Sequence, residues 1–252
     1  DLYPDVAVSL GVVRNRVLLR LLHELELFLY RSADCIVPIG PLIARCVEEK
    51  GIAPEKIEII PNWMDTNQIR PLGKETPFSE ERRLKEKFVV MYSGNIGLSQ
   101  GLENVILAAQ RTRDLEDLLY LFIGGGESLG RLKRMTKELK LENVEFLPYQ
   151  PKERLSESLS AADVHLLTLK RGLSSFSVPS KIYGIMASGR PLIASVDERS
   201  EIAMMVEEAD CGVRVEPEDP AALALAVRSL YNDRVKLDKL GLNGRTYLEE
   251  RI

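Results

Sequence analysis

From residue 88 onward, short apolar segments alternate with longer amphipathic ones, and this alternation limits the fold more than any other feature of the sequence. The apolar segments have the length and residue types of buried strands, which are expected at 88–92, 120–123, 144–147, 164–168, 191–195 and 212–215. Helices are expected between and after them, at 102–111, 127–140, 152–161, 181–187, 198–208 and 220–231. Strands joined by helices in this way form a parallel sheet that is covered on both faces. We therefore predict an α/β fold with a doubly wound sheet, whose ligand lies beyond the carboxyl ends of the strands.

The beginning of the chain contains an amphipathic segment at residues 17–30, whose apolar residues follow helical spacing. Charged residues interrupt this segment, so it is too short and too polar to cross a bilayer. Its polar face mixes acidic and basic residues, which favours a helix packed on a sheet over a helix lying on a membrane surface.

Two further strands are expected at 34–38 and 56–60, with a helix at 41–50 between them. A polar segment with several prolines and glycines follows at 63–87. Irregular polar segments of that length are uncommon inside one compact domain. We therefore expect two domains, 1–70 and 71–252.

The amino-acid composition indicates which partners and which cellular compartment to expect. The chain is 45% hydrophobic and 29% charged, as is typical of globular proteins with a substantial core. Its formal net charge of -4 provides no global positive field, so no nucleic-acid partner is expected. Cys35, Cys46 and Cys211 match no metal-ligand spacing, which favours a reduced, intracellular setting.

Three junctions between a strand and a helix contain residues that could contact a ligand. In residues 93–101, three glycines would let backbone N–H groups approach an anion at the start of a helix. A tight turn explains the same glycines, and their spacing is not that of the dinucleotide fingerprint. The second junction contains Gly124, Gly125 and Gly126, which permit positive φ and close packing but are also common in ordinary loops.

The third junction, at residues 174–191, contains Pro179, Ser180 and Lys181. Pro179 suits a helix start, and Ser180 is expected to cap the helix. A lysine in the first turn opposes the helix dipole, so Lys181 is unfavourable there unless an anion compensates it. A solvated lysine is the alternative interpretation.

Metal and nucleophile chemistry receive less support. The two histidines are His23, within the amphipathic segment, and His165, within an apolar strand. A core or strand-end role is favoured for His165 over a ligand role. No paired aspartates and no activated serine or cysteine motif occur in the sequence.

Three segments together resemble nucleotide-sugar glycosyltransferases of the GT-B fold: residues 60–65 (Ile-Pro-Asn-Trp-Met-Asp), 93–101 and 179–191. The sequence is similar to the large retaining family four, and within it to the bacterial capsule and O-antigen branch, which carries the Gly-Asn-Ile-Gly and Pro-Ser-Lys variants. Residues 1–5 resemble a segment of that branch usually written Asp-Leu-Trp-Pro. The likeness covers essentially the whole chain.

The resemblance implies that 71–252 is a complete Rossmann-like nucleotide-sugar domain. It implies that 1–70 is the second part of an acceptor-side Rossmann-like domain and its linker, with the first part missing. The resemblance implies that Lys181 is the catalytic residue and that the reaction requires no metal ion. The donor-binding residues that it implies are Gly94, Asn95, Ile96, Gly97, Gln100, Gly124, Gly125, Pro148, Tyr149, Ser180, Lys181, Tyr183 and Gly184.

The sequence departs from the family pattern at four positions. Many relatives carry Arg and Lys where this chain has the neutral Asn95 and Gln100. Relatives often carry two glutamates eight residues apart, at the positions of Phe176 and Gly184. The usual ribose-binding carboxylate is therefore absent.

The implied activity is transfer of a sugar from a nucleotide-sugar, expected to be a UDP-sugar, to a lipid-linked or glycan acceptor in surface polysaccharide synthesis. Lys181, helped by Lys170 or Arg171, would stabilise the departing diphosphate. No cofactor is expected beyond the donor substrate. The expected location is the cytoplasm, with peripheral association at the inner face of the cell membrane left open.

Two other functions stay open at this point. One is a non-catalytic nucleotide-sugar-binding partner subunit, which the missing glutamates favour, and the other is a UDP-sugar epimerase of the same fold. The chain by itself is expected to bind nucleotide and to transfer no sugar.

Overall fold

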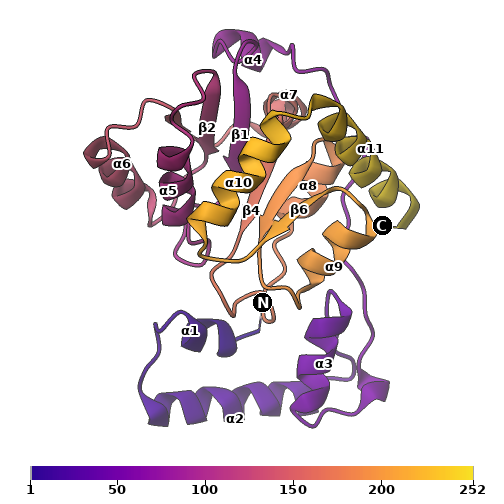
Figure 1. Cartoon of the computed structure of the whole chain (residues 1–252). Helices are drawn as coiled ribbons and strands as arrows, with labels where there is room; N and C mark the ends of the chain where they lie inside the picture. Colours follow the sequence, from indigo (N-terminus) through magenta and orange to yellow (C-terminus); the bar gives the residue numbers. More distant parts are fainter. Residues whose placement is uncertain (1, 252) are drawn as a thin grey trace.

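The computed structural model describes residues 2–251, and within them one six-stranded sheet forms the centre of the molecule (Figure 1). Its neighbouring strands are all parallel, in the order β3-β2-β1-β4-β5-β6. The strands are β1 (Phe88–Ser93), β2 (Leu118–Ile123), β3 (Val144–Leu147), β4 (Val164–Thr168), β5 (Leu192–Ser195) and β6 (Gly212–Val215). The prediction of a doubly wound α/β sheet is confirmed, and so are the positions of all six strands.

Helices follow the strands as the alternation predicts. They are α5 (Glu103–Arg111), α6 (Leu129–Glu138), η2 (Lys152–Arg154) with α7 (Leu155–Ser160), α8 (Lys181–Ala187), α9 (Glu201–Glu208) and α10 (Pro220–Tyr231). An additional helix, α11 (Arg234–Arg251), was not predicted. Its glycines resemble helix breakers in the sequence, but they allow close packing. A Cβ atom on Gly241 would lie 2.2 Å from the carbonyl oxygen of Gly189.

The core lies on both faces of the sheet because alternate strand residues point to opposite sides. In β1, Phe88, Val90 and Tyr92 pack with α5 and α10 on one face. Val89 and Met91 pack on the other face, which α8 and α9 also cover.

The order of the strands reverses between β1 and β4, which are neighbours in the sheet but not in the sequence. The helices that follow these two strands cover opposite faces, since α5 packs on one side and α8 on the other. The loops therefore diverge and leave a crevice at the carboxyl ends of β1 and β4.

The N-terminal segment, residues 2–60, lies beneath this end of the sheet in Figure 1. It contains α1 (Asp5–Ser9), α2 (Arg16–Ser32), α3 (Pro41–Glu49) and η1 (Pro54–Lys56). The strands expected at 34–38 and 56–60 are wrong. The two segments lie parallel, joined by one bridge between Ile36 and Ile57 and by a hydrogen bond of 3.1 Å from the N–H of Ile60 to the carbonyl oxygen of Pro38, but neither forms a strand. The apolar pattern suits a pleated strand, but two short extended segments without further neighbours are too few for a stable sheet.

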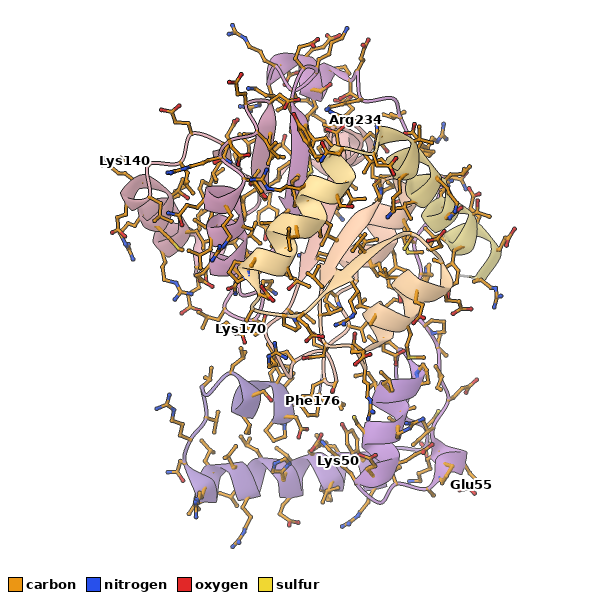
Figure 2. The ribbon with its side chains drawn as sticks, in the orientation of Figure 1. Lys50, Glu55, Lys140, Lys170, Phe176 and Arg234 are labelled. Atoms are coloured by element: carbon orange, nitrogen blue, oxygen red, sulfur yellow. The ribbon has the colours of Figure 1, made fainter. Side chains whose placement is uncertain are left out.

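The apolar face of α2 is exposed, with Leu21 62% and Phe28 64% accessible. The expectation that this helix packs on a sheet is therefore wrong for the residues described. Glu26 is the buried residue of α2, and its carboxylate is 2.6 Å from Lys50 Nζ, which also contacts Asp5 at 2.6 Å. Figure 2 shows Lys50 near the junction of α2 and α3. Across residues 2–251, every helix is too short or too polar to span a bilayer.

The segment 63–87 is more ordered than expected. It contains α4 (Pro77–Glu81), which begins with a capping box between Thr76 and Ser79. The backbone N–H groups of Arg70 and Leu72 donate to the hydroxyls of Ser156 and Ser160. The expected domain boundary between residues 70 and 71 thus lies inside a stretch that is hydrogen-bonded to α7. We call the part of the chain that contains the sheet, residues 71–251, the sheet domain.

Arg245 of α11 bonds this stretch from the other side. Its Nη1 donates to the carbonyl oxygens of Ile69 at 2.9 Å and of Ala187 at 2.8 Å. Its Nη2 donates to the carbonyl oxygen of Thr66 at 3.2 Å. One guanidinium group therefore joins the end of α8 to the segment that leads into the sheet domain.

Candidate functional site

A cavity of about 620 Å³ lies at the carboxyl ends of β1 and β4, where the doubly wound fold predicts a ligand. One wall is the loop after β1, and the other is the residues that lead into α8. Tyr3 of the N-terminal segment and Met64 of the segment 63–87 also line it. Of the predicted donor-binding residues, six line this cavity: Gly94, Asn95, Gln100, Ser180, Lys181 and Gly184.

The first glycine loop continues directly from β1. Gly94 has φ of 138°, a conformation that side chains other than glycine rarely adopt. The Gln100 side chain accepts a hydrogen bond of 3.0 Å from the N–H of Gly97, which closes the loop. Ile96 is completely buried, and its carbonyl oxygen accepts a hydrogen bond of 2.9 Å from the N–H of Ser128, so it supports the loop from behind and does not line the cavity.

The second glycine loop interlocks with the first. Gly124 has φ of 146°, and a Cβ atom there would lie 2.0 Å from the Gly94 carbonyl oxygen. The N–H of Ile96 donates to the carbonyl oxygen of Gly125 at 2.8 Å. Gly124 and Gly125 therefore hold the shape of the first loop and do not line the cavity themselves.

Pro148 and Tyr149 lie beyond the second loop. The Tyr149 ring is 58% exposed, and its hydroxyl donates to the carbonyl oxygen of Gly125 at 3.3 Å. This ring stands at the surface next to the glycine loops, in a position that suits a planar group such as a base.

Lys181 is the residue whose environment is most unusual. Its Nζ atom is buried and has no hydrogen-bond partner among the described residues. It lies 3.7 Å from the centroid of the Tyr92 ring. Burial lowers the pKa of Lys181 to about 7, so an anion in the cavity would both pair with the ammonium group and favour its charged form.

The residues next to Lys181 differ from expectation in two respects. Ser180 occupies the N-cap position of α8, but its side chain makes no capping hydrogen bond, so the expectation of a serine cap is wrong. Tyr183 is buried and lines a separate cavity with Tyr247 and Glu201. The structure does not bring Tyr183 together with the other predicted site residues.

The two positions where relatives often carry glutamate lie near the cavity. Phe176 is half-buried and packs against the core, and Figure 2 shows it in the loop that faces the N-terminal segment. Gly184 lines the cavity, and a Cβ atom there would make ordinary contacts of 3.7 Å or more. Neither position supplies a charged group.

The basic residues after β4 do not line the cavity. Arg171 forms an ion pair with Glu216 at 3.3 Å and donates to the carbonyl oxygen of Pro217. Lys170 lies beside Gly101. Among the described residues that line the cavity, Lys181 is thus the one whose side chain can carry a positive charge, besides His165.

His165 and Tyr92 were not predicted as site residues. His165 is 1% exposed, and its Nε2 lies 3.0 Å from the Leu159 carbonyl oxygen, as expected of a core histidine. It also lines the cavity, and burial lowers its pKa to about 4, which keeps it neutral. His165 is the second residue of β4, away from the carboxyl end of the strand, so its position in the sequence gave no signal for a site residue.

The residues described also bear on metal and disulfide chemistry. Among residues 2–251, no three His, Cys, Asp or Glu side chains are grouped closely enough to hold a metal ion. Cys35, Cys46 and Cys211 are free thiols in exposed, half-buried and buried positions.

Comparison with known proteins places the chain in a family. Residues 74–247 match the family described as Glycosyl transferases group 1. WbjE of Pseudomonas aeruginosa, named as a glycosyltransferase, is 32% identical over 246 residues, which cover 97% of this chain and 60% of WbjE. WcaI of Escherichia coli, named as a colanic acid biosynthesis glycosyl transferase, is 35% identical over 225 residues, which cover 88% of this chain and 54% of WcaI.

Solved structures agree with the architecture. Anabaena HepE, crystallised in complex with UDP-glucose, has a TM-score of 0.79 at 18% identity, covering 92% of this chain and 62% of HepE. The chain spans 60% and 54% of the length of the two curated relatives. Because the family match extends over most of its length, the chain belongs to the glycosyl transferases group 1 family and shares the GT-B type of α/β fold.

Proposed function

We propose that this chain binds the diphosphate of a nucleotide-sugar, expected to be a UDP-sugar, in the cavity beside Lys181. The observation that carries the proposal is the Lys181 ammonium nitrogen, which is buried without a hydrogen-bond partner among the described residues. Buried charges are normally paired, and a diphosphate is the partner that fits a cavity next to a glycine loop. HepE, a structural neighbour, has been crystallised with UDP-glucose, which supports this choice of ligand.

The predicted residues that line the cavity, together with Pro148 and Tyr149, form the rest of the donor site in this proposal. Gly94 and Asn95 face the diphosphate, and Gln100 holds their loop closed by accepting a hydrogen bond from the N–H of Gly97. Tyr149 and Pro148 flank the base, since the exposed Tyr149 ring lies beside Gly125. Ser180 and Gly184 face the sugar and ribose from the α8 side.

The proposed reaction is a retaining, metal-independent transfer of the sugar, as in the retaining family four that the sequence resembles. The bond between the anomeric carbon and the diphosphate oxygen breaks, the acceptor oxygen forms the new glycosidic bond, and the proton of the acceptor hydroxyl passes to the departing diphosphate. Negative charge grows on the departing diphosphate, and a preorganised positive group at that position lowers the barrier by about 3 kcal/mol. Lys181 is the proposed source of that stabilisation.

The whole protein is proposed to act in surface polysaccharide synthesis, on a lipid-linked or glycan acceptor at the inner face of the cell membrane. The names of WbjE and WcaI support a role of this kind. Residues 1–70 are proposed to belong to the acceptor side and 71–252 to the donor side. Because the chain spans little more than half of these relatives, transfer is proposed for the whole protein and donor binding for this chain.

The test of donor binding is calorimetry with UDP and with uridine. UDP is expected to bind far more tightly than uridine, and Lys181→Met is expected to weaken UDP by about 10–150-fold, equivalent to about 1.5–3 kcal/mol, while leaving uridine unchanged. Lys137→Met, which removes an exposed lysine of α6, is the matched control. Equal losses for UDP and uridine would contradict a diphosphate contact.

A second candidate is a nucleotide-sugar-binding subunit without transfer activity, which the uncharged Phe176 and Gly184 positions favour. Product analysis with UDP-sugars and lipid-linked acceptors, on this chain and on the whole protein, separates the two functions. Transfer by the whole protein and none by this chain is expected. UDP binding without transfer by either would establish the binding subunit, and interconversion of UDP-sugars without acceptor would establish an epimerase.

A further inference from the structure

Tyr92 lies at the end of β1, directly before Ser93 and Gly94, and its side chain is completely buried. Its ring is tilted against that of Phe122, with 6.2 Å between the ring centroids. Close packing in the core leaves such a ring little freedom to move. Tyr92 is therefore a fixed element at the edge of the cavity.

The face of this ring carries the Lys181 ammonium group. The Nζ atom lies 3.7 Å from the ring centroid, a distance at which the negative face of the ring attracts a cation. The lysine reaches the ring across Gly94, where an added Cβ atom would lie 3.2 Å from Nζ. The glycine thus leaves room for the path of the lysine.

The hydroxyl of the same side chain holds the opposite wall. It donates a hydrogen bond of 2.6 Å to the Asn95 carbonyl oxygen. The next residue, Ile96, is bonded through its N–H to the carbonyl oxygen of Gly125. The Tyr92 hydroxyl therefore fixes the loop at Asn95, a residue that lines the cavity.

We propose that Tyr92 is a positioning residue that sets both walls of the diphosphate site, holding Lys181 with its ring and the Asn95 backbone with its hydroxyl. It acts through these two groups and does not touch the donor itself. The inference rests on the proposed donor site. It adds the residue that determines where the cation and the loop stand relative to each other.

A direct test uses the unaltered chain. With lysine labelled at ¹³Cε, the ring current of Tyr92 is expected to shift the Lys181 Hε signals upfield of those of exposed lysines such as Lys137. The assignment comes from the signal that Lys181→Met removes. A Lys181 signal at the position of the exposed lysines would overturn the proposal without any change to Tyr92.

The functional test is a double-mutant cycle for UDP affinity. Tyr92→Leu is expected to weaken UDP by about tenfold or more when Lys181 is present, and by less than about threefold in the Lys181→Met background. Tyr92→Phe keeps the ring and is expected to retain most of the Lys181 effect. A structural role alone would give the same loss in both backgrounds, and that result would refute the inference.

Tyr120→Leu is the matched control, because Tyr120 is an equally buried tyrosine of the same core whose hydroxyl contacts Thr112 and not the cavity loops. It is expected to lower stability without coupling to Lys181. The two proposals fail separately. If the unaltered chain does not bind UDP, the donor site is wrong, whereas normal Lys181 dependence with additive Tyr92 effects overturns the role of Tyr92.

Discussion

The carboxylate of Glu201 accepts a hydrogen bond of 2.6 Å from the backbone N–H of Leu42, although 159 residues separate them in the sequence. Leu42 is in the first turn of α3, whose own N-cap residue is Gly40 and provides no side-chain cap. Glu201 begins α9 of the sheet domain. A helix start in the N-terminal segment is thus capped by a side chain of the sheet domain, which fixes the two parts to each other.

Removing this cap is expected to loosen α3 and leave the sheet unaffected. Glu201→Ala should raise amide hydrogen exchange in α3 by about 5–30-fold, because a lost cap costs about 1–2 kcal/mol. Hydrogen exchange followed by mass spectrometry measures this, with Glu207→Ala on the exposed face of α9 as the control. Unchanged protection of α3 would contradict the capping role.

Gly124 and Gly125 offer a matched pair for testing the interlocked loops. A Cβ atom on Gly124 would lie 2.0 Å from a backbone oxygen at positive φ, whereas one on Gly125 would be 3.6 Å from the edge of the Tyr149 ring. Gly124→Ala is therefore expected to cost about 2 kcal/mol or more in the free energy of unfolding, and Gly125→Ala less than about 0.5 kcal/mol. Urea denaturation measures both, and equal effects would speak against the interlock.

The buried ammonium group of Lys181 is expected to lower the free energy of unfolding by an amount that depends on pH. Its folded pKa of about 7 lies below that of an unfolded chain, so from about pH 7 to 10 the unfolded state binds the extra proton and stability rises with pH. Below pH 7 the whole penalty is present. Lys181→Met should therefore stabilise the chain by about 0.5–2 kcal/mol at pH 6, with a smaller gain at pH 9.

Urea denaturation of the unaltered chain and of Lys181→Met at the two pH values measures this difference, and Lys137→Met is again the control. A stabilisation of the same size at pH 6 and pH 9 would show that the lysine does not titrate in this range in the folded protein.

The exposed apolar face of α2 is expected to cause self-association of this chain as its concentration rises. Leu21→Lys combined with Phe28→Lys should shift the chain toward monomer in sedimentation experiments. Unfolding free energy should change by less than about 0.5 kcal/mol, because both side chains are already more than 60% exposed. Association that is unaffected by these changes would exclude this face as its cause.

The alternation of strands and helices from residue 88 onward was sufficient to predict the sheet, because every strand there has neighbours that satisfy its backbone. The same pattern at 34–38 and 56–60 was misleading, since an apolar run does not reveal whether partner strands exist. The missed α11 has the opposite cause. Gly241 and Gly244 look unfavourable in a helix until the close approach to residues 186–190 is known.

The site could be predicted in part. Lys181 was found because a lysine in the first turn of a helix opposes the dipole, and this local misfit is visible in a sequence. Tyr92 resembled one more apolar residue of β1, since its contacts with Lys181 and Asn95 depend on how the loops fold back over it. Ser180 looked like a cap, but its own α-region backbone conformation turns the hydroxyl away from that role.

The bonds from Arg245 to Thr66, Ile69 and Ala187 determine how a smaller version of this protein would have to be cut. The six strands and the glycine loops all lie between Phe88 and Val215, which suggests that a fragment of that length would be enough. Such a fragment would leave the last carbonyl of α8 without its guanidinium partner, directly behind the helix that carries Lys181. A minimal donor-binding fragment should therefore begin before Thr66 and continue past Arg245.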